Sequence, residues 1–231
     1  MDHKIWDEHY IKYLYETIFN RIKLYLPQEA KVLIEVGAGT GIGKTFLPNS
    51  ICADICFNRC LDATCDSVAL PFKSNSADAI ILKDAFHHIA DVESFIIEAH
   101  RVLRIGGRIL IFDPYWGLLA RFVYRFLHQE RFDAKVATWS FDTKSPWDSN
   151  QAITYVLLRR DREQFEQKFN RFLIKEHEVL IGPSFLLSGG VSRRTILSGK
   201  LLARLLKWEM KQPRWFNILR FFHIFSMTKV N

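Results

Sequence analysis

Two hydrophobic patterns alternate along the chain. Over residues 5–26, apolar side chains recur at spacings of three to five positions before Pro27, which predicts an amphipathic helix. Farther along, short and nearly continuous apolar runs end at acids or glycine turns, as buried strands do. Such runs predict strands at residues 32–36, 50–55, 65–68, 79–82, 108–112, 173–181 and 221–230.

Helical patterns separate many of these runs. They cover residues 44–47, 92–103, 118–126, 163–172 and 195–210, and Asp91 can cap the second of them. Strands that alternate with helices at short spacing predict a parallel sheet with helices on both faces. The last strand is expected to turn back as a hairpin. We therefore predict an α/β fold with a Rossmann-like, doubly wound, seven-stranded and mostly parallel sheet.

One segment departs from this alternation. Residues 115–171 contain helical patterns around a loop-like stretch with Pro146 and two tryptophans, which predicts a helical and loop insertion after the fifth strand. We place residues 29–231 in one domain and residues 1–28 in an N-terminal helix. The aromatic residues Trp6, Tyr10 and Tyr13 would let that helix act as a lid, and plain core packing is the alternative.

Composition indicates the size of the core and the cellular compartment. A hydrophobic fraction of 48% in 231 residues supports a sizeable core. The N-terminal residues lack the apolar stretch of a signal peptide, and no run of 18 uncharged apolar residues occurs, so we expect a cytoplasmic protein. The four cysteines, Cys52, Cys56, Cys60 and Cys65, lack a paired CxxC spacing, so we expect reduced thiols and no metal site.

Charge divides the chain in two. Residues 1–113 contain 12 basic and 15 acidic residues, whereas residues 114–231 contain 20 basic and 10 acidic residues. An excess of positive charge among aromatic residues favours an acidic or phosphorylated partner for the second part. The basic residues concerned are Arg121, Arg125, Arg131, Arg159, Arg160, Arg162, Arg193, Arg194, Arg204, Lys207, Lys211, Arg214 and Arg220. A solvated basic face is the alternative.

The first predicted strand leads into a glycine-rich turn, VLIEVGAGTGIGKT. Glycines allow positive φ angles and close approach of a ligand to the backbone. One interpretation is a P-loop, in which Lys44 would contact phosphates and Thr45 magnesium. The other is an acid at the strand end followed by alternate glycines, beginning with Glu35 and Gly37. The turn alone does not decide between them.

The segments that follow favour the second interpretation. Asp54 ends the second strand about 20 residues after the turn, where a carboxylate can bind ribose hydroxyls. The runs CDSVALPFKSNSADAIILKDAFHHI and EAHRVLRIGGRILIFDP come next, and Ile105 stands where proline is usual. Together with the turn, they resemble the class I S-adenosylmethionine-dependent methyltransferase superfamily, in particular its type-11-like members. The resemblance covers residues 30–114.

This resemblance implies a binding site for S-adenosyl-L-methionine at the carboxyl ends of the strands. The residues that it assigns to the cofactor are Glu35, Gly37, Ala38, Gly39 and Gly41 at the methionine end, Asp54 and Ile55 at the ribose, Asp66 and Ser67 at the adenine, and Asp84 and Ala85 near the sulfonium. Asp113 follows the fifth strand at the same edge. Phe57 could cover the adenine or belong to the core.

The resemblance also implies methyl transfer, which for a hydroxyl acceptor needs a group that removes a proton. His87 and His88 are the candidate bases, and a structural role is the alternative. We predict O-methylation of a sugar, lipid-linked or small-molecule acceptor, with contact to an acidic membrane surface as a further expectation. Nucleic acid is disfavoured, because the motif typical of base N-methyltransferases is absent. The alternatives are a non-catalytic cofactor-binding partner protein and a P-loop NTPase.

Overall fold

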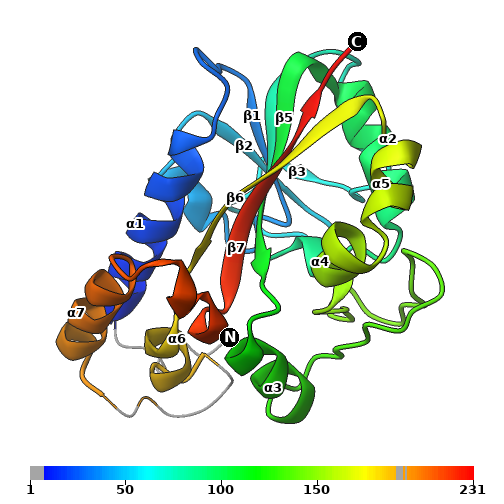
Figure 1. Ribbon diagram of the computed structural model, residues 1–231. Coiled ribbons are helices and arrows are strands. Elements are labelled where there is room, and N and C mark those ends of the chain that lie inside the picture. Colours follow the sequence, from blue (N-terminus) through cyan, green and yellow to red (C-terminus); the bar gives the residue numbers. More distant parts are fainter. Residues whose placement is uncertain (1–7, 191–194, 196) are drawn as a thin grey trace.

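A seven-stranded sheet forms the centre of the computed structural model, which describes residues 8–190, 195 and 197–231 (Figure 1). The strand order is β3-β2-β1-β4-β5-β7-β6. Strands β1 to β5 pair in parallel, and β7 lies antiparallel between β5 and β6. The bounds are β1 Leu33–Val36, β2 Ser50–Asp54, β3 Ala63–Thr64, β4 Ala77–Lys83, β5 Leu103–Pro114, β6 Phe172–Leu180 and β7 Phe222–Lys229. The predicted mostly parallel sheet and the antiparallel last strand are confirmed, but helical elements within residues 183–219 separate β6 from β7, so the two strands are not joined as a hairpin.

Two strands, β3 and β5, differ most from their predicted bounds. The third strand is only Ala63–Thr64, two residues before the predicted range, because its pairing with β2 ends where β2 ends. The fifth strand starts at Leu103, directly after helix α2, and runs through a glycine pair. Gly106 has a φ of 80°, so the strand changes direction there while its pairing with β4 continues on both sides.

Helices cover both faces of the sheet, as predicted (Figure 1). Helices α1 (Glu8–Leu24) and α7 (Gly199–Glu209) pack on one face, and α2 (Val92–Val102) and α5 (Arg162–Lys168) pack on the other. Alternate residues of β4 explain the two cores: Ile81 belongs to the α1 side and Ile80 to the α2 side. Each face is thus buried under its own apolar layer.

The segment after β5 contributes to the core. It contains α3 (Leu118–Phe126), α4 (Ile153–Tyr155) and the π-helical turn η3 (Val156–Arg160) before α5. Trp139 and Leu157 are buried in the same apolar cluster as α2. From Trp139 onward, the predicted insertion is therefore part of the layer that covers this face of the sheet, whereas α3 packs in the cluster on the opposite face. The remaining short elements are η1 (Ile42–Thr45), η2 (Phe86–His88), α6 (Pro183–Leu187) and η4 (Arg214–Leu219).

Helix α1 packs as a core helix. Tyr10 is buried, and its hydroxyl lies 3.4 Å from Ser184 Oγ, while Tyr13 packs partly buried against the same cluster. Trp6, the third residue of the predicted lid, lies outside the described residues. The short helix predicted at residues 44–47 is a 3-10 turn in the structure, η1. Among the described residues, no helix combines the length and the apolar character needed to cross a bilayer.

Candidate functional site

The glycine turn after β1 is packed at two points and open at a third. Gly37, Gly39 and Gly41 all have positive φ angles, of 71°, 56° and 73°. A Cβ at Gly37 would lie 2.5 Å from the Cβ of Ala85, and one at Gly41 would lie 2.9 Å from the carbonyl oxygen of Cys60. A Cβ at Gly39 would have no described atom within 4 Å. The exposed backbone at Gly39 is therefore where a ligand can approach.

Asp54 and Gly39 lie together at the end of β2. The carboxylate of Asp54 accepts hydrogen bonds from the backbone N–H groups of Gly39 (2.7 Å) and Cys56 (2.8 Å). Ile55 and Phe57 follow in a loop with exposed side chains, so Phe57, which is 79% exposed, is not a core residue. A half-buried carboxylate beside exposed apolar side chains suits a ligand with both hydroxyl groups and an aromatic face.

The turn after β3 brings Asp66 near the same edge. The backbone N–H of Cys65 donates to the carbonyl oxygen of Asp54 (2.9 Å), which holds the two segments side by side. Asp66 is exposed, and its Oδ1 accepts the backbone N–H of Val68 (3.1 Å) and lies 3.5 Å from Ser67 Oγ. The structure therefore places Asp66 and Ser67 at the same edge of the sheet as Asp54.

Glu35 is placed differently from the prediction. Its side chain is only 1% exposed, its Oε2 lies 3.6 Å from Cys52 Sγ, and a Cβ at Gly43 would overlap its carboxylate. Burial raises the pKa of Glu35 above its usual value. The carboxylate therefore lies beneath the turn and supports it, whereas the sequence predicted direct contact with the cofactor. Ala38 is likewise buried, and its N–H donates to the carbonyl of Ala53 (3.1 Å).

The P-loop interpretation does not fit this geometry. The Lys44 ammonium lies 2.6 Å from Asp62 Oδ1, so the charge that would contact phosphates is paired outside the turn. The residues after the glycines form only the short turn η1 and no longer helix whose N-terminus could bind phosphate. The four cysteines are free thiols, as predicted.

The end of β4 meets the glycine turn. Asp84 is exposed and has a φ of 56°, a conformation that non-glycine residues rarely adopt. Its N–H donates to the carbonyl of Phe112 (2.7 Å), which ties this turn to the end of β5. The next residue, Ala85, is the one that contacts Gly37. The structure therefore brings Asp84 and Ala85 to the methionine end of the predicted cofactor site.

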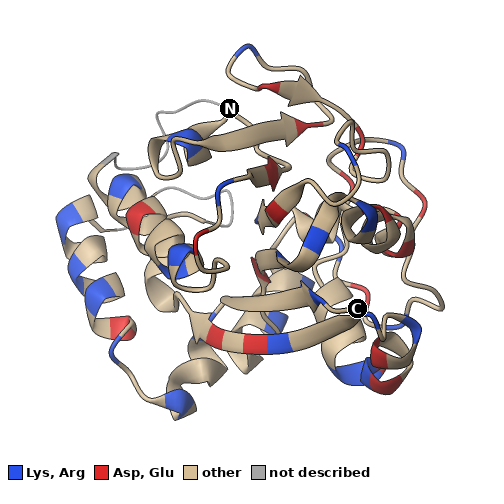
Figure 2. Ribbon diagram, turned by 90° about the horizontal axis from the view of Figure 1, so that it is seen from above, with Lys and Arg blue, Asp and Glu red and all other residues tan. Residues whose placement is uncertain are grey.

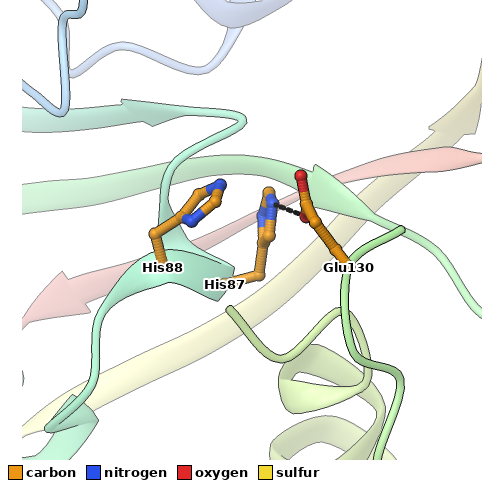
Figure 3. Close-up of side chains that lie close together, drawn as sticks. All are labelled: His87, His88 and Glu130. Atoms are coloured by element: carbon orange, nitrogen blue, oxygen red, sulfur yellow. Dashed lines mark ion pairs between the residues drawn. The ribbon is translucent and has the colours of Figure 1, made fainter. Parts of the chain in front are cut away.

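His87 is clamped between two carboxylates. It is almost fully buried, and its Nδ1 lies 2.9 Å from Asp113 Oδ1. Figure 3 shows the contact on the other side of the ring, where Nε2 lies 3.3 Å from Glu130 Oε2. Burial lowers the pKa of His87, but the two carboxylates outweigh burial and hold the pKa well above 6.5. The two carboxylates therefore favour the protonated imidazolium, which can donate from both nitrogens. A base must accept a proton, so His87 does not fit the predicted role of base.

Glu130 is a member of this cluster that sequence reasoning missed. It follows α3 in the loop-rich segment and also accepts hydrogen bonds from Ser149 Oγ (3.0 Å) and Gln151 Nε2. Burial raises the pKa of Glu130, but the hydrogen bond and the positive charge of His87 lower it to about 2. The residue stands 43 positions after His87 in a stretch without a motif, so no local signal in the sequence could have identified it.

His88 differs from its neighbour in exposure and charge. It is half-buried, its ring centroid lies 4.3 Å from that of His87, and its Nδ1 lies 3.2 Å from the carbonyl oxygen of Asp148. Because a carbonyl only accepts, Nδ1 carries the proton and Nε2 keeps its lone pair. Burial and the charge of His87 lower the pKa of His88 below 6.5. The neutral imidazole can therefore accept a proton.

Two groups of described residues bring three metal-ligand atoms within 4.8 Å of one another: His87, His88 and Glu130, and Asp84, His87 and Asp113. Both groups contain His87. Its two nitrogens already lie at hydrogen-bond distance from carboxylates, which accounts for these contacts without a cation. The arrangement therefore corresponds to a hydrogen-bonded cluster.

Comparison with known proteins relates the segment that contains the glycine turn to methyltransferases. Residues 34–111 match the family model described as a methyltransferase domain. Over 56 residues the chain is 36% identical to the ubiquinone/menaquinone biosynthesis C-methyltransferase UbiE of Ruegeria sp. (strain TM1040). That alignment covers 24% of this chain, and the chain spans only 22% of the length of this curated relative.

Solved structures share the fold over nearly the whole chain. The YcgJ protein of Bacillus subtilis has a TM-score of 0.54 at 15% identity, with 94% of this chain and 99% of that chain covered. An S-adenosylmethionine-dependent methyltransferase of Thermotoga maritima has a TM-score of 0.54 at 18% identity, with 94% and 89% covered. Geranyl diphosphate C-methyltransferase of Streptomyces coelicolor A3(2) has a TM-score of 0.51 at 12% identity, with 94% and 80% covered. At these identities the likeness concerns the fold.

Proposed function

We propose that this protein is an S-adenosylmethionine-dependent methyltransferase that methylates a hydroxyl oxygen of a sugar, lipid-linked or small-molecule acceptor. The match of residues 34–111 to the methyltransferase-domain model supports the class of reaction. The observation that carries the proposal is the pairing of a neutral His88 with a clamped His87 beside Asp84 and Ala85. The methyl carbon of the donor is already activated by sulfonium, but a hydroxyl oxygen that takes up the methyl group must lose its proton, and a neutral imidazole at this position can accept it.

The residues around the glycine turn fit S-adenosylmethionine. The open position at Gly39 leaves space against the backbone, and Asp54 keeps acceptor capacity for ribose hydroxyls. Exposed Ile55 and Phe57 offer apolar contact for an adenine, and Asp66 offers an acceptor for its amino group. When bound, the cofactor supplies an electrophilic methyl group on a positively charged sulfur.

The chain's own residues would then hold and move one proton. His88 Nε2 is the atom that accepts the proton of the acceptor hydroxyl, while its Nδ1–H stays on the Asp148 carbonyl and fixes the ring. The nearby carboxylates of Glu130 and Asp84 favour the imidazolium that results. His87 remains protonated between Asp113 and Glu130 and positions its neighbour.

Two measurements test the proposal. Calorimetry with S-adenosylhomocysteine and with ATP–magnesium should give binding of the first only, and Lys44→Ala should leave that binding unchanged. Methyl transfer from labelled S-adenosylmethionine is then measured with fractionated lipid and water-soluble cell extracts. His88→Gln should lower the transfer rate about 100-fold or more with unchanged cofactor affinity. The matched control is His100→Gln, a half-buried histidine on α2.

Three outcomes would contradict the proposal in different ways. ATP binding that Lys44→Ala abolishes would return the chain to the P-loop interpretation. Binding of S-adenosylhomocysteine without transfer to any fraction would favour a non-catalytic cofactor-binding partner protein. A His88→Gln variant as active as the His100→Gln control would remove the histidine from the chemistry and leave an acceptor that needs no base.

A further inference from the structure

Helix α3 presents an outward face of unusual composition. Leu118, Phe122 and Phe126 are all exposed, and their spacing of four residues places them on one stripe of the helix. Arg121 and Arg125 lie along the edge of that stripe and are also exposed. The opposite side of the helix is buried on the sheet through Ala120, Val123 and Tyr124. The outer half of this helix therefore combines an apolar row with a cationic row.

The same composition continues on the neighbouring elements. A Cβ at Gly117, just before α3, would lie 2.7 Å from the carbonyl oxygen of Asn217, so the start of α3 lies directly against η4. Trp215 and Ile218 of η4 are exposed. The buried ring of Phe216 joins Trp215 (centroids 5.7 Å apart) to the exposed Trp208 at the end of α7 (5.5 Å). We call these six exposed side chains the aromatic surface: Leu118, Phe122, Phe126, Trp208, Trp215 and Ile218.

Positive charge accompanies the aromatic surface without opposing carboxylates. Residues 114–128 contain no acid, and the single acid of residues 199–219, Glu209, is fully buried and accepts hydrogen bonds from Gly182 and Ser184. Figure 2 shows the row of basic residues along α7. Among the ion pairs of the described residues, none includes the exposed Arg121, Arg125, Lys207 or Arg214.

Other basic residues of the second part of the chain are occupied within the fold. Arg159 and Arg162 both pair with Glu176, at 2.6 and 2.7 Å. Arg160 pairs with Asp161, and Arg220 is buried with its guanidinium on carbonyl oxygens. Of the thirteen predicted basic residues, Arg193 and Arg194 lie outside the described residues. The structure separates the described ones into a set occupied within the fold and a set without a carboxylate partner.

We propose that the aromatic surface docks this protein on a bilayer that contains anionic lipids. Exposed aromatic and aliphatic side chains can enter the headgroup region, while arginine and lysine remain at the level of the lipid phosphates. Helix α3 lies at the end of the molecule toward which β5 runs, the end that also holds the candidate site (Figure 1). Docking would therefore hold that site close to the membrane. The inference does not depend on methyl transfer.

Vesicle sedimentation tests the docking surface. The full chain should bind vesicles of phosphatidylcholine and phosphatidylglycerol, bind pure phosphatidylcholine far less, and dissociate as salt rises. Phe122→Ser with Phe126→Ser should weaken binding about tenfold or more, because each ring is already exposed and loses only its membrane contact. Arg121→Gln and Arg125→Gln should each weaken binding about fivefold.

A matched control lies at the other end of the sheet. Ile105 and Leu173 are 66% and 63% exposed, close to the 55% and 63% of Phe122 and Phe126, and stand near the starts of β5 and β6. Ile105→Ser with Leu173→Ser should bind vesicles as the unmodified chain does. Circular dichroism and affinity for S-adenosylhomocysteine should be unchanged in all variants.

Several results would overturn the inference. Equal vesicle binding by the phenylalanine pair and the control pair would exclude the aromatic surface. Equal binding to neutral and anionic vesicles would exclude a role of the basic side chains in binding anionic lipids. Self-association that the phenylalanine variants abolish, without any vesicle binding, would make the surface an interface between two copies of this chain.

Discussion

Gly39→Ala separates the ligand role of the glycine turn from its role in folding. Gly39 has a φ of 56°, and an added Cβ would have no described atom within 4 Å. The only cost in the folded protein is therefore the left-handed backbone, about 1–2 kcal/mol for an alanine. For a chain of this size, each kcal/mol lowers the melting temperature by about 2–4 °C. The variant should fold and remain stable at room temperature.

Cofactor affinity should respond much more strongly than stability. The new methyl group would stand where the exposed backbone is expected to meet the ligand, and overpacking of a close contact costs about 1–3 kcal/mol. We therefore expect the dissociation constant of S-adenosylhomocysteine to rise about tenfold or more, measured by isothermal titration calorimetry.

Gly106→Ala is the matched control for this experiment. Gly106 has a φ of 80°, and an added Cβ there also has no described atom within 4 Å, but it lies at the start of β5, away from the turn. Its stability cost should be similar and its cofactor affinity unchanged. If the two variants bound S-adenosylhomocysteine equally well, the ligand would not lie over Gly39 and the assignment of the turn would be wrong.

Two further substitutions probe the packing around the site. Gly37→Ala should destabilise the fold by more than Gly39→Ala does, because its Cβ would lie 2.5 Å from that of Ala85. The free energy of unfolding is measured with urea, and a Gly37→Ala variant as stable as the unmodified chain would contradict this expectation. The carboxylates of Asp113 and Glu130 raise the pKa of His87, so its contribution to stability is complete below about pH 6.5 and is lost as pH rises through the folded pKa. His87→Gln should therefore lower the free energy of unfolding by about 3 kcal/mol near pH 6 and flatten the decline of stability at higher pH, measured by urea titration. If the variant lost stability with pH as steeply as the unmodified chain, the decline would belong to another group.

Local patterns in the sequence determined the sheet and the glycine turn at the carboxyl ends of its strands. The apolar runs, the alternate glycines and the acid after the second strand are features of neighbouring residues, and they predicted the turn and its approach to Asp54. Strand existence was predictable for the same reason, since burial on both faces makes a run apolar throughout. The bounds of the short β3 could not be predicted in this way, because its length depends on where its partner β2 ends.

Tertiary structure decided which charged groups meet. Glu130 reaches His87 only because the loop-rich segment after α3 folds back over the end of β4, and Glu35 is covered because Gly43 packs on it. Whether Arg121 has a carboxylate partner likewise depends on where acidic residues far away in the sequence lie in the fold. Hydrophobic periodicity reports whether a residue is buried, but a polar contact depends on two positions far apart in the chain, and only the packed fold brings them within a few ångströms.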